Sequence, residues 1–191
     1  MSFLFDPDVV DEIGQRHIGK PIDGMVADVG ADLKAKYGHH VHLDQPLFFN
    51  SAGGIMYQIK LFAMTPREYI MICGSAIGSS GHSGRHPVAF WDTILSGGAR
   101  YMHQDELASR EYPTGSRIFV DRWQAATIHF PDHCWMLEYA RGSLFALLPF
   151  GLANTLFNTL DWKSALRTLR VYGTLARRTL AARRSATGPP A

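Results

Sequence analysis

Between residues 47 and 137 the sequence divides into short apolar segments separated by turn-forming residues. Each segment is rich in aromatic or β-branched residues and too short for a typical helix, which indicates β-strands. Strands in such close succession are typical of a sandwich or a barrel. Several are apolar at consecutive positions, which predicts a sheet buried on both faces or lining a cavity. The segments are 47–50, 55–59, 69–73, 118–120, 127–130 and 134–137.

Helical patterns flank this region. Residues 1–45 read as a helical segment in which Asp6 or Asp8 can cap a first helix and Gly14 weakens it. After the strand region, 46–146, residues 147–184 predict two helices, and Asp161 is a suitable cap for the second. An apolar stripe is expected along that second helix, formed by Trp162, Leu166, Leu169, Tyr172 and Leu175. Residues 185–191 contain Gly-Pro-Pro and are expected to be a disordered tail.

Charge is distributed unevenly along the chain. Residues 1–162 carry 12 basic and 17 acidic side chains, whereas residues 163–191 carry seven basic and none acidic. A cationic helix could bind nucleic acid, but the apolar stripe beside these cations favours a helix lying on a membrane surface, so no nucleic-acid partner is expected. The sequence contains neither a run of about 18 apolar residues nor a signal peptide, so we expect a peripheral membrane protein. Its two cysteines, Cys73 and Cys134, lie in apolar runs and are expected to be buried thiols.

A glutamate interrupts the last of these apolar strands. The strand period of two places Cys134, Met136 and Glu138 on one face and Trp135, Leu137 and Tyr139 on the other. Glu138 therefore emerges among apolar neighbours whichever face is inward. Taken alone, it could also be an ordinary surface glutamate at the end of a strand.

Several motifs along the chain resemble those of one family, the fungal C-8 sterol isomerases and the sigma non-opioid receptor. They are Asn50-Ser-Ala-Gly-Gly54, the glycine-rich run 74–85, Asp92-Thr-Ile-Leu-Ser-Gly97, Trp135-Met-Leu-Glu-Tyr-Ala-Arg-Gly142, Leu148-Pro-Phe-Gly151 and Thr159-Leu-Asp161, with a further match at Phe5-Asp6-Pro7. The resemblance implies a mainly β (α+β) fold with a cupin-like barrel and N-terminal helices. It also implies two C-terminal amphipathic helices that cover the barrel mouth on the membrane, and a homotrimer. Unlike the family pattern, no N-terminal transmembrane helix is expected for this chain.

The resemblance also implies a site in which Glu138 binds a ligand's ammonium group, Asp92 shares a proton with it, and Tyr69 orients it. Two buried carboxyl groups in contact cannot both stay ionised, so one of them keeps a proton. Such a pair can donate a proton to one alkene carbon and remove one from another, which moves a ring double bond without a cofactor. The pocket wall implied by the resemblance consists of Ile55, Ile59, Met71, Cys73, Phe90, Phe130, Leu147, Leu148, Gly151 and Tyr172, and it suits a sterol or hydrophobic amine.

One departure bears on catalysis. The fungal isomerases carry acidic residues two or three positions before the Asp92 site, where this chain has Ala89 and Phe90, whereas Asp92 itself matches the sigma receptor. The leading hypothesis is a sterol C-8 isomerase. The alternative is a non-catalytic, receptor-like binder of hydrophobic amines or sterols, and a barrel filled by its own side chains is a third interpretation.

Some of these residues also have ordinary interpretations. Asp92 could cap a helix, and Tyr69 could be a half-buried strand tyrosine. His82 and Ser83 favour a glycine-built turn over a nucleophile. His39, His40 and His42 lack companion ligands, so no metal is expected. The location expected is a membrane surface, facing the cytoplasm in a prokaryote or on the endoplasmic reticulum in a eukaryote.

Overall fold

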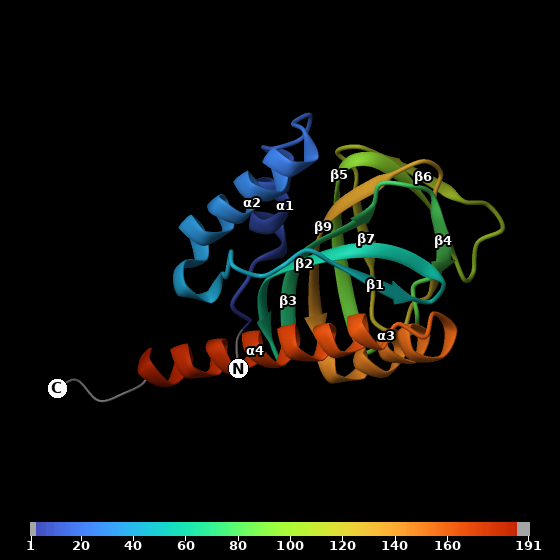
Figure 1. Ribbon diagram of the computed structural model, residues 1–191. Helices are drawn as coiled ribbons and strands as arrows, with labels where there is room; N and C mark the ends of the chain where they lie inside the picture. Colours follow the sequence, from blue (N-terminus) through green and yellow to red (C-terminus); the bar gives the residue numbers. More distant parts are fainter. Residues whose placement is uncertain (1–2, 187–191) are drawn as a thin grey trace.

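The computed structural model describes residues 3–186, which form a nearly closed antiparallel barrel with helices outside it and across one end (Figure 1). The apolar segments expected from the sequence are strands, and the structure adds β4, β5 and β6, which the sequence pattern did not reveal. The strands are β1 Phe48–Ala52, β2 Ile55–Thr65, β3 Glu68–Ser75, β4 Ser79–His82, β5 Val88–His103, β6 Arg110–Pro113, β7 Arg117–Val120, β8 Ala126–Phe130 and β9 Cys134–Gly142.

Strand pairing establishes the barrel. The sheet runs in the order β1-β2-β3-β9-β5-β8-β4, and β6 and β7 also pair with β5. Strand β4, at one end of this order, lies against the β1–β2 hairpin at the other, because the His82 backbone N–H donates to Gly53 O at 2.8 Å and the Met56 N–H donates to Ser79 Oγ at 2.9 Å. Closure of this kind leaves little of an unpaired sheet edge. The predicted fold class, mainly β with flanking helices, is confirmed.

Strand β5 is the longest strand and the one that connects the two parts of the sheet. Its first part pairs with β9 and β7, and its second part pairs with β6 and β8. A β-bulge interrupts the register between Ile94 and Ser96. The interpretation of Asp92 as a helix cap is therefore wrong, because Asp92 lies within β5 and pairs with both neighbouring strands.

The central strands β3 and β9 are buried on both faces, as their apolar runs predicted. Helix α1, Pro7–Gln15, and helix α2, Ile22–Tyr37, cover the outer face (Figure 1). The side chain of Asp6 accepts a hydrogen bond from the Asp8 N–H at 2.9 Å and caps α1, which confirms the predicted start of that helix. A short 3₁₀ turn, η1, spans Gly38–His40 after α2. The outer core contains Val10, Ile13, Met25, Val29 and Leu33 from the helices, packed on Ile70, Ile72, Leu95, Leu137 and Tyr139 from the strands.

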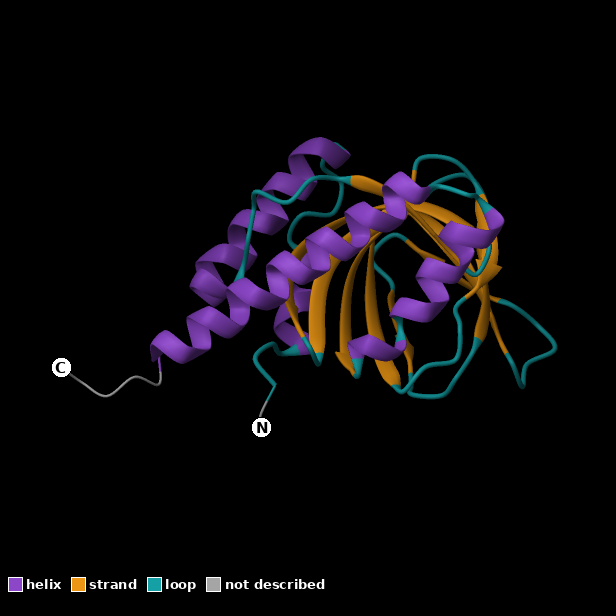
Figure 2. Cartoon of the chain, turned by 60° about the horizontal axis from the view of Figure 1, so that its bottom comes forward, coloured by secondary structure: helices purple, strands orange, loops and turns teal. Residues whose placement is uncertain are grey.

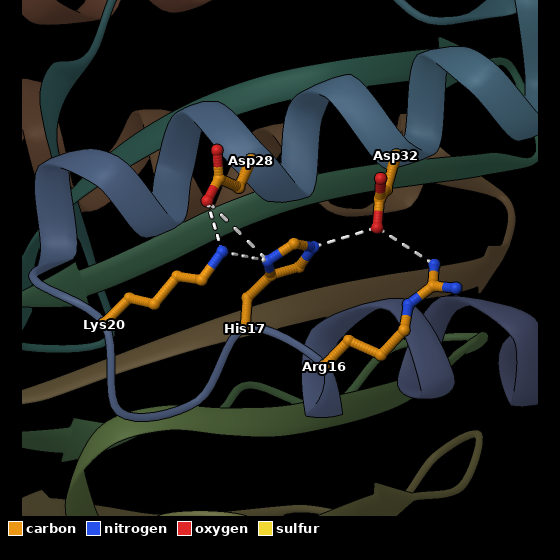
Figure 3. A network of polar contacts seen from close by, with 5 residues as sticks. All are labelled: Arg16, His17, Lys20, Asp28 and Asp32. Carbon is orange, nitrogen blue, oxygen red and sulfur yellow. Dashed lines mark hydrogen bonds and ion pairs between the residues drawn. The ribbon is translucent and has the colours of Figure 1, made fainter.

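A polar network joins the two N-terminal helices (Figure 3). Lys20 Nζ donates to His17 Nδ1 at 3.1 Å and to Asp28 at 2.5 Å. Since the lysine ammonium can only donate, His17 Nδ1 accepts, and Nε2–H of the same ring donates to Asp32 at 2.9 Å. Arg16 pairs with the same Asp32 oxygen at 3.0 Å. The network fixes the α1–α2 connection and lies apart from the barrel interior.

The C-terminal helices lie across the open end of the barrel (Figure 2). They are η2 Leu144–Ala146, α3 Leu148–Ala153, the π-helical turn η3 Asn154–Asn158 and α4 Trp162–Ala186. The Ser164 N–H donates to Asp161 Oδ1 at 3.0 Å, which confirms the predicted cap of the second helix. The expected tail began at residue 185, but α4 includes residues 185 and 186, and residues 187–191 lie outside the described part of the chain.

The single apolar stripe predicted for this second helix is wrong, because α4 has two apolar faces. Leu175 is fully buried, and Tyr172 packs against the inner core, which is the cluster of buried side chains inside the barrel that includes Ile59, Leu61 and Ile94. These two residues of α4 therefore face the barrel. Trp162, Leu166 and Leu169 are exposed to solvent. Among residues 3–186, no helix is long and apolar enough to span a bilayer.

Candidate functional site

The inner face of β9 carries the glutamate singled out by the sequence. Cys134 and Met136 belong to the inner core, whereas Trp135 and Leu137 belong to the outer core, as the period of two predicted. Glu138 follows on the inner face and borders a cavity enclosed by the barrel. Because it borders this cavity, Glu138 is only partly buried, while the flanking strand residues are buried.

Asp92 lies directly opposite Glu138 in the β5–β9 ladder. Side chains that face each other in an antiparallel pair have Cβ atoms about 4.5–5.5 Å apart, so these two carboxyl groups are neighbours on the inner face. Asp92 is 3% exposed, and both residues line the same cavity. The structure thus brings together the two acidic residues that the sequence placed 46 positions apart.

Two donors from β3 face the Glu138 carboxylate. The Tyr69 hydroxyl donates to Oε1, and the Cys73 thiol lies 3.9 Å from Oε2. Burial raises the pKa of Tyr69 and of Cys73, and the nearby Glu138 charge raises both further, so both groups stay protonated donors. Cys73 and Cys134 are buried free thiols, which confirms that expectation.

The Asp92 carboxyl group has a different environment. The Tyr101 hydroxyl donates to Asp92 Oδ2 across 3.4 Å. The other oxygen, Oδ1, is buried and has no hydrogen-bond partner among the described residues. A buried carboxylate oxygen without a donor is unfavourable, so this environment favours the protonated form of Asp92.

The pKa values of the pair follow from this environment. Burial raises the pKa of Glu138 to about 7, although the hydrogen bonds from Tyr69 and the interaction with Asp92 oppose that rise. Burial, followed by the charge of Glu138, raises the pKa of Asp92 well above its usual range. Above about pH 7 the pair therefore keeps one proton, held mainly by Asp92, while Glu138 carries the negative charge.

The cavity around the pair is mostly apolar. It encloses about 1050 Å³ of empty space, part of it open to solvent. The barrel strands contribute its walls, and α3 and α4 cover it with Leu148, Gly151, Leu152, Thr168 and Tyr172. A cavity of this kind, with a few polar groups at one place, suits a large apolar ligand that has one polar or cationic feature.

The structure places most of the predicted pocket residues on this cavity. The lining includes Glu138, Asp92, Tyr69, Ile55, Met71, Cys73, Phe90, Phe130, Leu147, Leu148, Gly151 and Tyr172. Ile59 is fully buried in the inner core and is not part of the lining. His82 and Ser83 form a turn, since His82 Nδ1 accepts from the Gly84 N–H at 2.8 Å and Ser83 Oγ accepts from the Ala126 N–H at 2.9 Å.

Sequence reasoning missed several lining residues. Tyr57 has the same strand parity as Ile55, so the period of two could have identified it. Tyr101 could not be found in this way, because the bulge in β5 reverses the parity between Asp92 and Tyr101. His86 also lines the cavity, and burial lowers its pKa, so its ring is neutral near pH 7. The other lining residues that were missed are Asn50, Ala52, Gly74, His82, Ser83, Val120, Ile128, Met136, Phe150, Leu152 and Thr168.

Comparison with known proteins identifies what the chain resembles. The family model described as "ERG2 and Sigma1 receptor like protein" matches residues 1–184. The C-8 sterol isomerase ERG2 of Gibberella zeae is 33% identical over 174 residues, which cover 90% of this chain and 74% of that protein. Sigma non-opioid intracellular receptor 1 of Gallus gallus is 33% identical over 172 residues, covering 89% of this chain and 78% of the receptor.

Solved structures similar to this chain include cupins. An RmlC-like cupin from Shewanella frigidimarina overlays with a TM-score of 0.46 and 10% identity, covering 55% of this chain and 92% of the cupin. A cupin 2 conserved barrel domain protein from Rhodopseudomonas palustris overlays with a TM-score of 0.43 and 12% identity, covering 51% of this chain and 72% of that protein. The strand pairing described above establishes the barrel independently of these overlays.

Proposed function

Because this chain belongs to the ERG2 and Sigma1 receptor like family, we propose that it is a sterol C-8 isomerase-like protein whose Glu138 and Asp92 move a ring double bond. The observation that carries the proposal is the carboxyl pair, paired across β5 and β9 inside an apolar cavity. A protonated and an ionised carboxyl group side by side supply an acid and a base at one place, which a double-bond shift requires.

The proposed reaction is balanced in protons. Asp92 gives its proton to one alkene carbon, and a carbocation forms on the neighbouring carbon. Glu138 then removes a proton from the carbon on the other side of that cation, and the new double bond forms there. The negative charge of the pair stabilises the cation between these steps. A proton transfer from Glu138 to Asp92 restores the starting state, and Tyr69 keeps the Glu138 carboxylate oriented throughout.

A second candidate function is the binding of hydrophobic amines without turnover. Glu138 is ionised above its pKa of about 7, with Tyr69 and Cys73 donating to it, and it faces an apolar cavity. A ligand ammonium group at this place would form an ion pair with the Glu138 carboxylate. Its positive charge would occupy the position that the carbocation has in the proposed reaction. The presence of Ala89 and Phe90, where fungal isomerases carry acids, favours this alternative.

We also propose that the protein rests on a membrane surface through the helices that close the barrel. The residues that support this contact are large, apolar and exposed, and lie on η2, η3, α4 and the connection between them: Phe145, Phe157, Leu160, Trp162, Leu166 and Leu169. Lys163, Arg167 and Arg170 are exposed on the same helix and suit anionic lipid headgroups. An apolar ligand could then reach the cavity from the bilayer.

The test is conversion of a delta-eight sterol by the purified protein in lipid or detergent, followed by mass spectrometry. Glu138→Gln and Asp92→Asn are the site variants, and Glu111→Gln, an exposed glutamate paired with Arg100, is the matched control. We expect a delta-seven product from the unmodified protein and the control, with a loss of at least about 100-fold in both site variants. Amine binding without any conversion would replace the isomerase proposal by the second candidate.

A further inference from the structure

Tyr101 reaches the carboxyl pair because of the bulge in β5. Side chains alternate between the two faces of a strand, so a residue nine positions after Asp92 belongs on the opposite face of a regular strand. The bulge between Ile94 and Ser96 adds one residue and reverses this alternation. Before the bulge, Asp92 and Ile94 face the barrel interior, and after it Ala99 and Tyr101 do.

The hydrogen bonds to the two carboxyl groups are distributed unequally. Both oxygens of Glu138 face a donor, since Tyr69 donates to Oε1 and the Cys73 thiol lies beside Oε2. Asp92 receives one donor, the Tyr101 hydroxyl at Oδ2, and its Oδ1 has none within residues 3–186. Buried polar atoms are nearly always hydrogen-bonded, so the unpartnered oxygen is the place for a proton.

We infer, on the basis of the function proposed above, that Tyr101 is a positioning residue: by holding Asp92 Oδ2, it leaves Oδ1 as the oxygen that carries the proton beside Glu138. Tyr69 performs the corresponding task on Glu138, so each carboxyl group has its own tyrosine. Tyr101 is 2% exposed, and its ring packs edge-on against Tyr112 at 5.6 Å, which restricts its hydroxyl to this position.

Other titratable groups also face the pair. Glu138 is surrounded by Tyr69 and Cys73 from β3, Tyr57 from β2 and Tyr172 from α4, and its charge raises the pKa of each of these groups. Asp92 faces Glu138 and Cys134 from β9, Tyr101 from β5 itself and Cys73 from β3. On its other side, β7 presents the apolar Ile118. These tyrosines and cysteines stay neutral near pH 7, so among the groups named here only the two carboxyl groups titrate there, and His82 and His86 also border the cavity.

The experiment measures the affinity of the full-length protein for tritiated N,N-dimethyl-4-phenylpiperidinium from about pH 5 to about pH 10. The charge of this cation is fixed, so any inflection belongs to the protein. The acid inflection reports the protonation of Glu138, and the alkaline inflection reports the loss of the proton from Asp92. Tyr101→Phe removes the donor to Asp92, and Tyr112→Phe is the matched control, because Tyr112 lies outside the cavity lining.

The two tyrosines should move different inflections. A donor to a carboxylate stabilises its charged form, so Tyr101→Phe should raise the alkaline inflection by about one pH unit and leave the acid inflection in place. Tyr69→Phe should raise the acid inflection instead. Replacement of Tyr101 by 3,5-difluorotyrosine strengthens the donor without changing its shape, and it should lower the alkaline inflection. This third variant covers the case in which Tyr101→Phe fails to fold.

The outcomes separate this inference from the proposed function. An alkaline inflection that stays in place in both Tyr101 variants would overturn the role of Tyr101 and leave the proposed function standing. A shift of the same size in Tyr112→Phe would also overturn it, because the effect would then come from packing. If the unmodified protein binds the cation without any inflection, the carboxyl pair is not its binding site and both proposals are wrong.

Discussion

At the scale of single residues, the character of the site comes from burying two acids next to each other. The cavity lining contains histidine but no lysine or arginine, so no permanent positive charge lies beside Glu138 and Asp92. The proton that the two carboxyl groups share is what keeps the negative charge of the pair at one. Three neutral donors, Tyr69, Cys73 and Tyr101, replace the water that each carboxyl group loses on burial. Such an arrangement stabilises a positive charge in the cavity at the expense of the stability of the empty protein.

Glu138→Gln should therefore abolish binding of a hydrophobic cation and stabilise the fold at alkaline pH. Burial raises the pKa of Glu138 to about 7 in the folded protein, above its pKa in the unfolded chain. The free energy of unfolding is therefore highest below the unfolded-state pKa of this group and falls as the pH rises from there through about 7. The variant should exceed the unmodified protein by on the order of 2 kcal/mol in free energy of unfolding at pH 8, and by much less at pH 5.

Urea unfolding at the two pH values measures this difference. Glu111→Gln, which changes an exposed glutamate, is the control and should show no such dependence. Equal stability of Glu138→Gln and the unmodified protein at pH 8 would contradict the raised pKa.

At the scale of elements, α4 has one apolar side that closes the barrel and a second apolar side that is exposed. Thr168, Tyr172 and Leu175 face the barrel, and Trp162, Leu166 and Leu169 face away from it. The exposed apolar side chains follow one another at intervals of four and three residues, which places them on one face of the helix. In water this exposed apolar face adds no stability to the fold, whereas on a lipid surface its side chains would be buried.

Replacing Trp162, Leu166 and Leu169 together by serine should release the protein from anionic vesicles. The change removes the exposed apolar face and leaves the barrel-facing side chains of α4 intact. Vesicle co-sedimentation measures it, and we expect at least about a tenfold loss of bound protein. The matched control replaces three other exposed apolar side chains, Met102, Leu107 and Phe119, by serine. Similar losses in both triple variants would move the membrane contact away from α4.

Helix α1 offers a test of how closely the N-terminal helices pack on the sheet. A Cβ atom at Gly14 would lie 3.1 Å from Thr93 Cγ2 and 3.3 Å from side chains of Leu95 and Leu137, whereas one at Gly24 in α2 would meet nothing within 4 Å. Gly24 lies in the first turn of α2, so Gly24→Ala should stabilise the protein by about 0.5 kcal/mol, the lower end of the range for a helix interior. Gly14→Ala should gain less or lose stability. Equal gains in thermal unfolding would contradict the close packing.

At the scale of the whole molecule, local patterns predicted most elements but not the way the barrel closes. The short strands, the Asp6 and Asp161 caps and the placement of Glu138 on the same strand face as Cys134 and Met136 all follow from neighbouring residues. The strand β5 did not, because Ser96, Gly97 and Gly98 interrupt its apolar pattern at the bulge. The partnership of Asp92 with Glu138 depends on strand register, which only the resemblance to a known family indicated. The homotrimer stays a prediction.

The measurement that tests the central claim most directly is isotope-edited infrared spectroscopy of the carboxyl groups. The full-length protein is labelled with ¹³C at the aspartate side-chain carboxyl carbon and studied at about pH 8, where ordinary aspartates are fully ionised. We predict one isotope-shifted C=O band of a protonated carboxylic acid, absent in Asp92→Asn and retained in Asp132→Asn, which changes an exposed aspartate. A spectrum without such a band would contradict the claim that Asp92 keeps the proton of the pair.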